Sequence, residues 1–171
     1  MSRLPNPVDQ LVGKDKELYE KMKQARGRID GMYATLLNHP ALTEKVSDLG
    51  AYLRFNATLP GKYREFVILY CAHQFRAEYE WIKHVPPALE AGLDDAIIEA
   101  IKKEEAFNEP YSLFVEVAHC ALNLQNIPEK LQQDVIAVVG VQGLLELVVL
   151  ANFYKMIAGI IFCFDVPLPA E

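Results

Sequence analysis

Residues 65–93 read EFVILYCAHQFRAEYEWIKHVPPALEAGL. The carboxylate of Glu65 opens an apolar run, and the amphipathic run that comes next carries Glu80 and His84 four positions apart. Side chains four apart are neighbours on a helix, so this carboxylate and this imidazole can touch. A turn of the chain within residues 74–77 would bring Glu65 back to them. The stretch therefore predicts a helical hairpin that gathers two carboxylates and one histidine in apolar surroundings.

Helical periodicity continues on both sides of this hairpin. Apolar residues recur every three or four positions over residues 14–37 and 40–57. The predicted helices are 14–37, 40–57, 62–76, 77–91, 94–105, 110–124, one from Pro128, and a last one after Gly140 and Gly143 that ends near Phe162. Pro86 and Pro87 should kink the fourth of these or restart it. The apolar runs are too long for strands and lack hairpin signals.

We therefore expect an all-α fold, a single-domain bundle of seven or eight helices. Residues 1–13 carry Pro5 and Pro7 and are predicted to form an extended arm, and residues 14–171 the helical domain. The long apolar segment Val135–Phe164 is interrupted by four polar residues, so a buried helix is favoured over a membrane span. These four are Gln142, Glu146, Asn152 and Lys155.

Composition excludes some classes of function. The net charge is -6 and the pI is near 5.3, which disfavours a nucleic-acid surface. The first residues contain no apolar core of signal-peptide length, so we expect a cytoplasmic protein. The three cysteines, Cys71, Cys120 and Cys163, are about fifty residues apart and form no CxxC pair. They are interpreted as reduced thiols.

The spacing within the hairpin matches part of a known pattern. Glu65, Ala77, Glu80 and His84 occupy the places of a Glu, two Cys and a His in the peroxidase branch of the alkylhydroperoxidase D proteins. The chain resembles the carboxymuconolactone decarboxylase family, which shares that fold and in which a Glu commonly replaces the second Cys. The likeness extends to Leu59-Pro60, Ala88, Gly92 and Leu93, and further to Leu145-Glu146-Leu147, Tyr154 and residues 164–169.

The resemblance implies a cofactor-independent lyase or isomerase that acts by general acid/base chemistry on a small carboxylated lactone or a related carbonyl compound. In such a reaction CO2 leaves and a proton is delivered to the resulting dienolate. His84 would be the acid, with Glu80 and Glu65 setting its protonation state. If Glu65 is enclosed, its pKa should rise, as a proton donor near neutral pH requires. The expected substrate-binding residues are Tyr79 and Trp81 and, by proximity in the sequence only, Arg54, Arg64 and Arg76 as holders of a substrate carboxylate.

Each of these residues also has an ordinary structural interpretation. His84 could be a partly exposed helical histidine, Glu80 half of a surface i,i+4 pair, and Glu65 a carboxylate favoured by the dipole of its helix. Glu146, alone among apolar neighbours, must find a partner if it is buried, either in the site or across a subunit contact. His119 beside Cys120 is favoured as a core position.

Two other classes of function stay open. A thiol peroxidase of the alkylhydroperoxidase type would have to recruit Cys71 or Cys120, because both cysteines of the pattern are absent. A non-catalytic oligomeric binding protein could use the same fold, since proteins of this family are commonly homo-oligomers, trimers or hexamers. We expect no metal, because carboxylate-bridged metal sites of helical bundles use two Glu-x-x-His sequences and this chain has one histidine at another spacing. We expect no cofactor either.

Overall fold

The computed structural model describes residues 4–27, 29 and 31–168, and this part of the chain contains eight α-helices and no strand. The helices are α1 (Gly13–Arg26), α2 (Gly31–Leu36), α3 (Pro40–Ala51), α4 (Gly61–Gln74), α5 (Glu78–Glu90), α6 (Asp95–Lys102), α7 (Tyr111–Leu122) and α8 (Glu129–Cys163). A 3₁₀ turn, η1 (Val8–Gln10), precedes them, and a π-helical turn, η2 (Tyr52–Asn56), continues α3. The predicted all-α class is confirmed.

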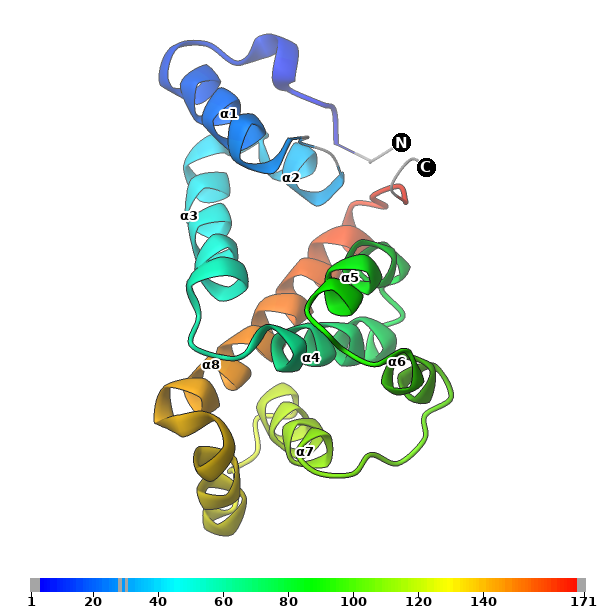
Figure 1. Cartoon of the computed structure of the whole chain (residues 1–171). Coiled ribbons are helices and arrows are strands. Elements are labelled where there is room, and N and C mark those ends of the chain that lie inside the picture. The colour runs from blue at the N-terminus through cyan, green and yellow to red at the C-terminus, as the bar shows by residue number, and fades with distance from the viewer. Residues whose placement is uncertain (1–3, 28, 30, 169–171) are drawn as a thin grey trace.

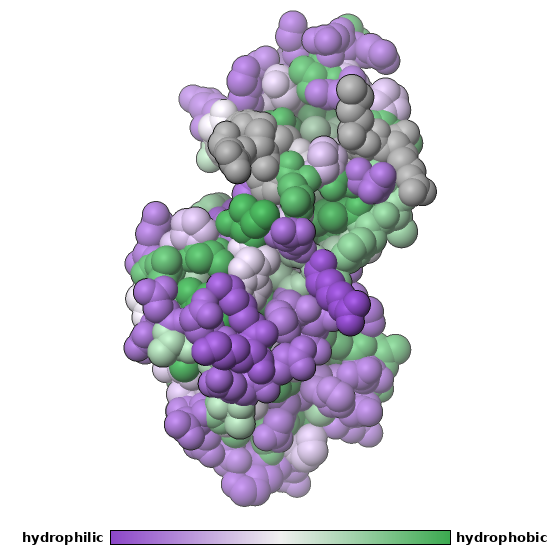
Figure 2. Space-filling model, turned by 90° about the vertical axis from the view of Figure 1, so that its right-hand side faces the viewer, coloured by the Kyte–Doolittle hydropathy of each residue, from purple (hydrophilic) through white to green (hydrophobic). Residues whose placement is uncertain are grey.

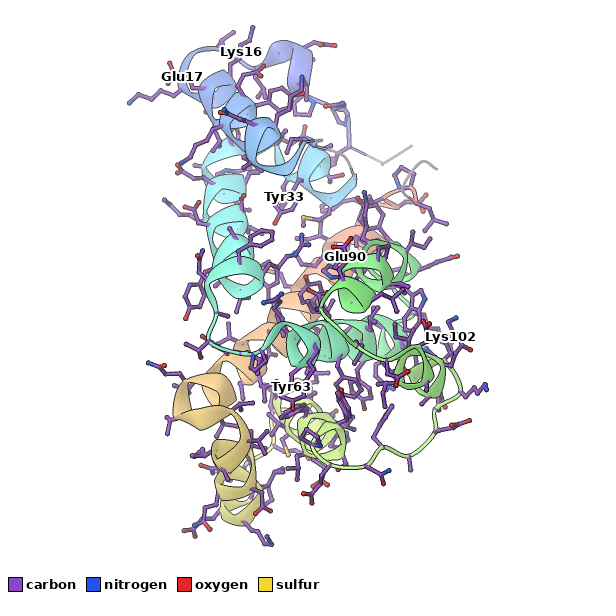
Figure 3. All side chains as sticks on the ribbon, viewed as in Figure 1. Lys16, Glu17, Tyr33, Tyr63, Glu90 and Lys102 are labelled. Atoms are coloured by element: carbon purple, nitrogen blue, oxygen red, sulfur yellow. The ribbon has the colours of Figure 1, made fainter. Side chains whose placement is uncertain are left out.

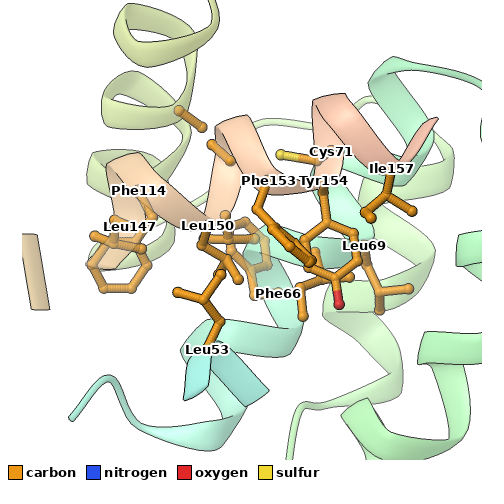
Figure 4. Packing of buried hydrophobic residues seen from close by; sticks show 14 of the residues in the cluster. Leu53, Phe66, Leu69, Cys71, Phe114, Leu147, Leu150, Phe153, Tyr154 and Ile157 are labelled. Carbon is orange, nitrogen blue, oxygen red and sulfur yellow. The ribbon is translucent and has the colours of Figure 1, made fainter. Parts of the chain in front are cut away.

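Helix α4 lies at the centre of the bundle and packs against α5, α6, α7 and α8 (Figure 1). Its sequence explains this position, because residues 66–69 are apolar on every side of the helix. Phe66, Ile68 and Leu69 have no exposed surface. Figure 4 shows Phe66 and Leu69 packed beside side chains of α8, among them Leu150 and Ile157. Helix α4 is therefore the enclosed central helix of the bundle.

The N-terminal region differs from the sequence prediction. The single helix expected over residues 14–37 is two helices, α1 and α2, because α1 ends at Gly27, whose φ is 74°. The predicted helix 40–57 is α3 followed by the turn η2. Within the predicted arm, residues 8–10 form the turn η1 and are not extended. Asn38 holds the arm by donating a hydrogen bond to the Pro5 carbonyl at 2.9 Å.

Helix α5 runs through Pro86 and Pro87 without interruption, so the expected restart at these prolines is wrong. Each proline removes one helical hydrogen bond, to the carbonyls of Ile82 and Lys83 respectively. Both of those residues are exposed, so water can satisfy their carbonyls. The helix ends at Glu90, and the amide of Leu93 donates to the carbonyl of Ala88 at 2.9 Å.

Helix α8 is bent at Gly140, where φ is 74° and ψ is 172°. This backbone conformation is available essentially to glycine alone, and the predicted division of the C-terminal helices lies here. The second predicted break, Gly143, lies inside the helix. Length and composition alone would allow α8 to cross a membrane, and 39% of its most apolar 18-residue window is buried within the protein. One face of α8 packs on α4 and α7.

Candidate functional site

The hairpin of α4 and α5 brings Glu65 and His84 together in the interior. His84 Nδ1 lies 2.7 Å from Glu65 Oε2, and the exposed fractions of these two residues are 4% and 2%. On the outer side of the pair, Arg64 Nε lies 3.4 Å from Glu65 Oε1. A carboxylate can only accept hydrogen bonds, so Nδ1 carries the proton and Nε2 is the nitrogen that can exchange one.

The second ring nitrogen of His84 faces two more functional groups. The Tyr154 hydroxyl lies 3.0 Å from Nε2, and Glu80 Oε2 lies 3.4 Å from it. Tyr154 belongs to α8 and projects from that helix with its hydroxyl pointing away from the helix, as Figure 4 shows. Nε2 can therefore accept a hydrogen bond from the Tyr154 hydroxyl when His84 is neutral and donate one when His84 is charged. Glu80 is the natural acceptor in the charged state.

The charges of this cluster shift its pKa values in opposite directions. Burial favours neutral imidazole, but hydrogen bonds to Glu65 and Glu80, and their charges, outweigh it and raise the pKa of His84 above its usual value. Burial also opposes ionisation of Glu65, yet the bond to His84 and the nearby arginines lower the pKa of Glu65. The rise expected for Glu65 is therefore wrong: it is a carboxylate at neutral pH and not a proton donor.

A cavity of about 340 Å³ adjoins the cluster, between the N-terminal helices and the pair α5 and α8. Figure 2 shows that the molecule narrows below the N-terminal helices and that apolar side chains gather there. Figure 3 shows Tyr33 of α2 in the same region. The cavity is lined by Ala25, Met32, Tyr33, Gly50, Arg54, Phe55, Tyr79, Glu80, Lys83, His84, Phe153, Tyr154 and Ile157.

Gly50 keeps part of this cavity open. A Cβ atom there would lie 2.9 Å from the Tyr33 hydroxyl and 3.1 Å from the Phe153 ring, so either ring would have to move. The close approach of these rings to α3 therefore requires glycine. The cavity walls combine aromatic surface with a few polar groups, which is typical of sites for small molecules.

The structure brings together most of the residues predicted for the site, but not all. Glu80, His84, Tyr79 and Arg54 line the cavity, and Glu65 lies directly behind His84.

Arg64, Arg76 and Trp81 do not line this cavity. Arg64 is turned to Glu65, whereas Arg76 and Trp81 line a separate surface cavity together with His73 and Glu104. Successive residues of a helix are rotated by about 100°. Tyr79 and Trp81 flank Glu80 in the sequence, so their side chains leave α5 on nearly opposite sides.

Sequence reasoning missed three polar residues of the cavity wall. Tyr33 and Lys83 carried no signal of their own, and Tyr154 entered only as part of the family likeness. Burial and the nearby charge of Glu80 raise the pKa of Tyr154 well above its usual value, so it is a neutral hydroxyl. Its position in an apolar helix was a usable signal, because a buried tyrosine hydroxyl needs a polar partner.

The remaining candidate groups lie elsewhere. Cys71 is buried and its pKa is raised to about 12 by burial, and Cys71, Cys120 and Cys163 are all absent from the cavity lining. Among the described residues, no group of three His, Cys, Asp or Glu side chains is arranged to hold a metal ion. The predicted absence of a cofactor stays a prediction.

No protein-family model matches this sequence, and a search of curated proteins found no similar sequence. The resemblance to the carboxymuconolactone decarboxylase family therefore stays a hypothesis, and the chemistry of the cavity is the basis for a functional proposal.

Proposed function

We propose that this protein is a cofactor-independent lyase or isomerase of the carboxymuconolactone decarboxylase type, with the corresponding alkylhydroperoxidase D-like fold. Its substrate would be a small carboxylated lactone or a related carbonyl compound, and His84 would be its general acid. The observation that carries the proposal is the position of His84 Nε2, which faces Tyr154 and Glu80 at the cavity wall while Nδ1 is held by Glu65.

The pair of Glu65 and His84 suits proton donation near neutral pH. Glu65 fixes the imidazole orientation and stabilises its charged form, so a proton is available at Nε2 above the usual pKa of histidine.

Decarboxylation at this site would take place in two steps, loss of CO2 and protonation of carbon. The bond between the substrate carbon and its carboxylate breaks, CO2 leaves, and the electron pair passes into the conjugated carbonyl to give a dienolate. His84 Nε2 then delivers its proton to carbon, and neutral His84 regains a proton from solvent. One proton is consumed in each turnover. The neutral Tyr154 hydroxyl is close enough to Nε2 to donate a hydrogen bond to the neutral imidazole after the transfer.

A thiol peroxidase receives less support from the same residues. That chemistry needs an accessible thiolate close to a second thiol. Cys71 has a pKa of about 12 and is fully buried, so its thiol stays protonated at neutral pH. Ala77 and Glu80 stand where the peroxidase pattern has its cysteines.

The test is CO2 release from γ-carboxymuconolactone between about pH 5 and pH 9 by wild type, His84→Gln and His73→Gln. His73 is a matched control, since it also pairs with a glutamate, Glu104 at 3.2 Å, but lies outside the cavity. We expect His84→Gln to lower turnover by about a hundredfold or more and His73→Gln to leave it within about twofold. Equal activity in all three proteins would contradict the role of His84. No CO2 release from this lactone or from related β-keto acids would contradict the proposed reaction.

A further inference from the structure

The cavity presents one guanidinium, that of Arg54, and its Nε atom is buried without a hydrogen-bond partner in the described part of the chain. A buried donor left unpaired is costly, and a polar group bound in the cavity is one partner that would satisfy it. The charge of Arg54 helps to lower the pKa of Glu65 and opposes the rise in the pKa of Tyr154. The guanidinium therefore lines the same cavity as His84, Glu80 and Tyr154 and is within electrostatic reach of them.

Arg54 belongs to η2, a single π-helical turn between α3 and the loop that leads to α4. Such turns are rare and are frequent at functional sites. Leu53, the residue before Arg54, is only 2% exposed and anchors the turn in the core. The ends of the turn are held by one carboxylate on another helix, that of Glu146 in α8.

Glu146 accepts four hydrogen bonds from the two sides of η2. Its Oε1 atom lies 2.9 Å from the Tyr52 hydroxyl and 3.0 Å from the Thr58 amide. Its Oε2 atom lies 3.0 Å from the Thr58 hydroxyl and 2.8 Å from the Leu59 amide. Burial opposes its charge, but the amides of Thr58 and Leu59 and the two hydroxyls outweigh burial and lower the pKa of Glu146. Arg54 thus stands between two points of the chain that the Glu146 carboxylate, charged at neutral pH, fixes to α8.

We propose that Arg54 forms a subsite for a ligand carboxylate in this cavity and that Glu146, which does not line the cavity, is the positioning residue for Arg54. The proposal rests on the proposed function for the nature of the ligand, a small carboxylated carbonyl compound. A leaving carboxylate loses its charge as it becomes CO2, so a cation helps most at a carboxylate that is retained in the product. The subsite therefore selects substrates that carry a second anionic group besides the carboxylate that leaves. A planar monocarboxylate is the smallest ligand that tests binding at this subsite alone.

The experiment measures benzoate binding by calorimetry at low ionic strength, with benzamide as the neutral comparison. Wild type should bind benzoate saturably and benzamide at least about tenfold more weakly. Arg54→Gln should weaken benzoate binding by about tenfold or more, and Arg54→Lys by less because it keeps the charge. Arg76→Gln, at the separate surface cavity, should leave it unchanged.

Glu146→Gln and Tyr52→Phe test the positioning role. Each variant removes some of the hydrogen bonds by which Glu146 holds the two sides of η2. We expect benzoate binding to weaken by about three- to tenfold and the NMR titration of His84 to stay unchanged. Tyr52→Phe deletes one hydrogen bond and keeps the carboxylate, so it decides the question if Glu146→Gln does not fold. Unchanged affinity in both variants would overturn the role of Glu146.

Failure of the subsite and failure of the proposed function give different results. Benzoate is not turned over, so its binding is independent of any proton transfer by His84. Absence of saturable benzoate binding, equal binding of benzamide, or an equal loss in Arg54→Gln and Arg76→Gln would overturn the subsite, whatever the result of the CO2 assay.

Discussion

The two ring nitrogens of His84 have separate tasks because different helices supply their partners. Glu65 of α4 fixes Nδ1 at 2.7 Å, and Tyr154 of α8 meets Nε2 at 3.0 Å. The hairpin alone would give a buried ion pair, and purely structural ion pairs also shift pKa values. The cavity beside Nε2 turns the pair into a candidate for proton transfer.

Replacing Glu65 by Gln should destabilise the protein, because the buried imidazole loses its charged partner. We expect a loss of about 1–3 kcal/mol in the free energy of unfolding, measured in urea near pH 6. Glu104→Gln is the matched control, since its contact with His73 is 3.2 Å long and its side chain is 75% exposed. The control should cost less than about 1 kcal/mol. Equal losses in the two variants would show that burial of the pair has no consequence.

The pH dependence of stability follows from the two shifted pKa values. The pKa of Glu65 is lowered from 4.5, so its contribution is present above about pH 4.5 and is lost as pH falls further. The pKa of His84 is raised from 6.5, so its contribution is full below about pH 6.5 and is lost as pH rises through the higher folded value. The pair should therefore stabilise the protein most between these two values.

This predicts that the difference in melting temperature between wild type and His84→Gln is largest between about pH 4.5 and pH 6.5 and shrinks as pH rises. Thermal unfolding followed by circular dichroism across pH 4 to 9 measures it. A difference that grows from pH 6.5 upward would mean that His84 is buried in its neutral form.

The sequence predicted the members of the polar cluster that lie in the hairpin of α4 and α5, but not the one that comes from α8. Glu80 and His84 are four apart on one helix, and Glu65 is one chain reversal away. Tyr154 is separated from His84 by 70 positions, so its place depends on how α8 packs on α4. Arg54 was one of three arginines chosen by proximity, and the turn η2 that orients it leaves no clear pattern in the sequence.

At the scale of the elements, periodicity predicted most helices and local backbone chemistry decided their ends. The break between α1 and α2 was missed because apolar spacing continues across residues 27–31, where Gly27 ends the helix. The effect of the two prolines on the continuity of α5 was overestimated, because the carbonyls that they leave unpaired belong to exposed residues. The bend of α8 could be predicted, since Gly140 interrupts an otherwise continuous apolar helix.

Gly140 and Gly159 of α8 provide a matched pair for testing that bend. A Cβ atom would meet nothing within 4 Å at either position, so only the backbone differs. Gly140→Ala should destabilise the protein by about 1–3 kcal/mol because φ is 74° there. Gly159→Ala should stabilise it by about 0.4–1 kcal/mol, because Gly159 is helical and alanine is the better helix former. Urea unfolding decides, and a stabilising Gly140→Ala would mean that the bend is not required.

At the scale of the whole molecule, the outer face of α8 leaves apolar side chains in contact with solvent. Val141, Leu145 and Val149 lie four positions apart and are 59%, 61% and 43% exposed. The homo-oligomer predicted from the sequence would cover such a stripe.

Light scattering at micromolar concentration tests this prediction. We expect an assembly larger than 19.3 kDa, and we expect Leu145→Asp to reduce its mass without loss of helical circular dichroism. Glu116→Ala, at an exposed position of α7, should leave the mass unchanged. A monomeric wild type would contradict the prediction.

The most direct measurement of the central claim is an NMR titration of the His84 ring in wild type and in Glu65→Gln. The claim is that Glu65 and Glu80 make His84 a proton donor near neutral pH at the wall of the cavity. It predicts that His84 titrates above the 6.5 of an ordinary histidine and that Glu65→Gln lowers this value. A pKa below 6.5 in wild type, or no change in the variant, would contradict it.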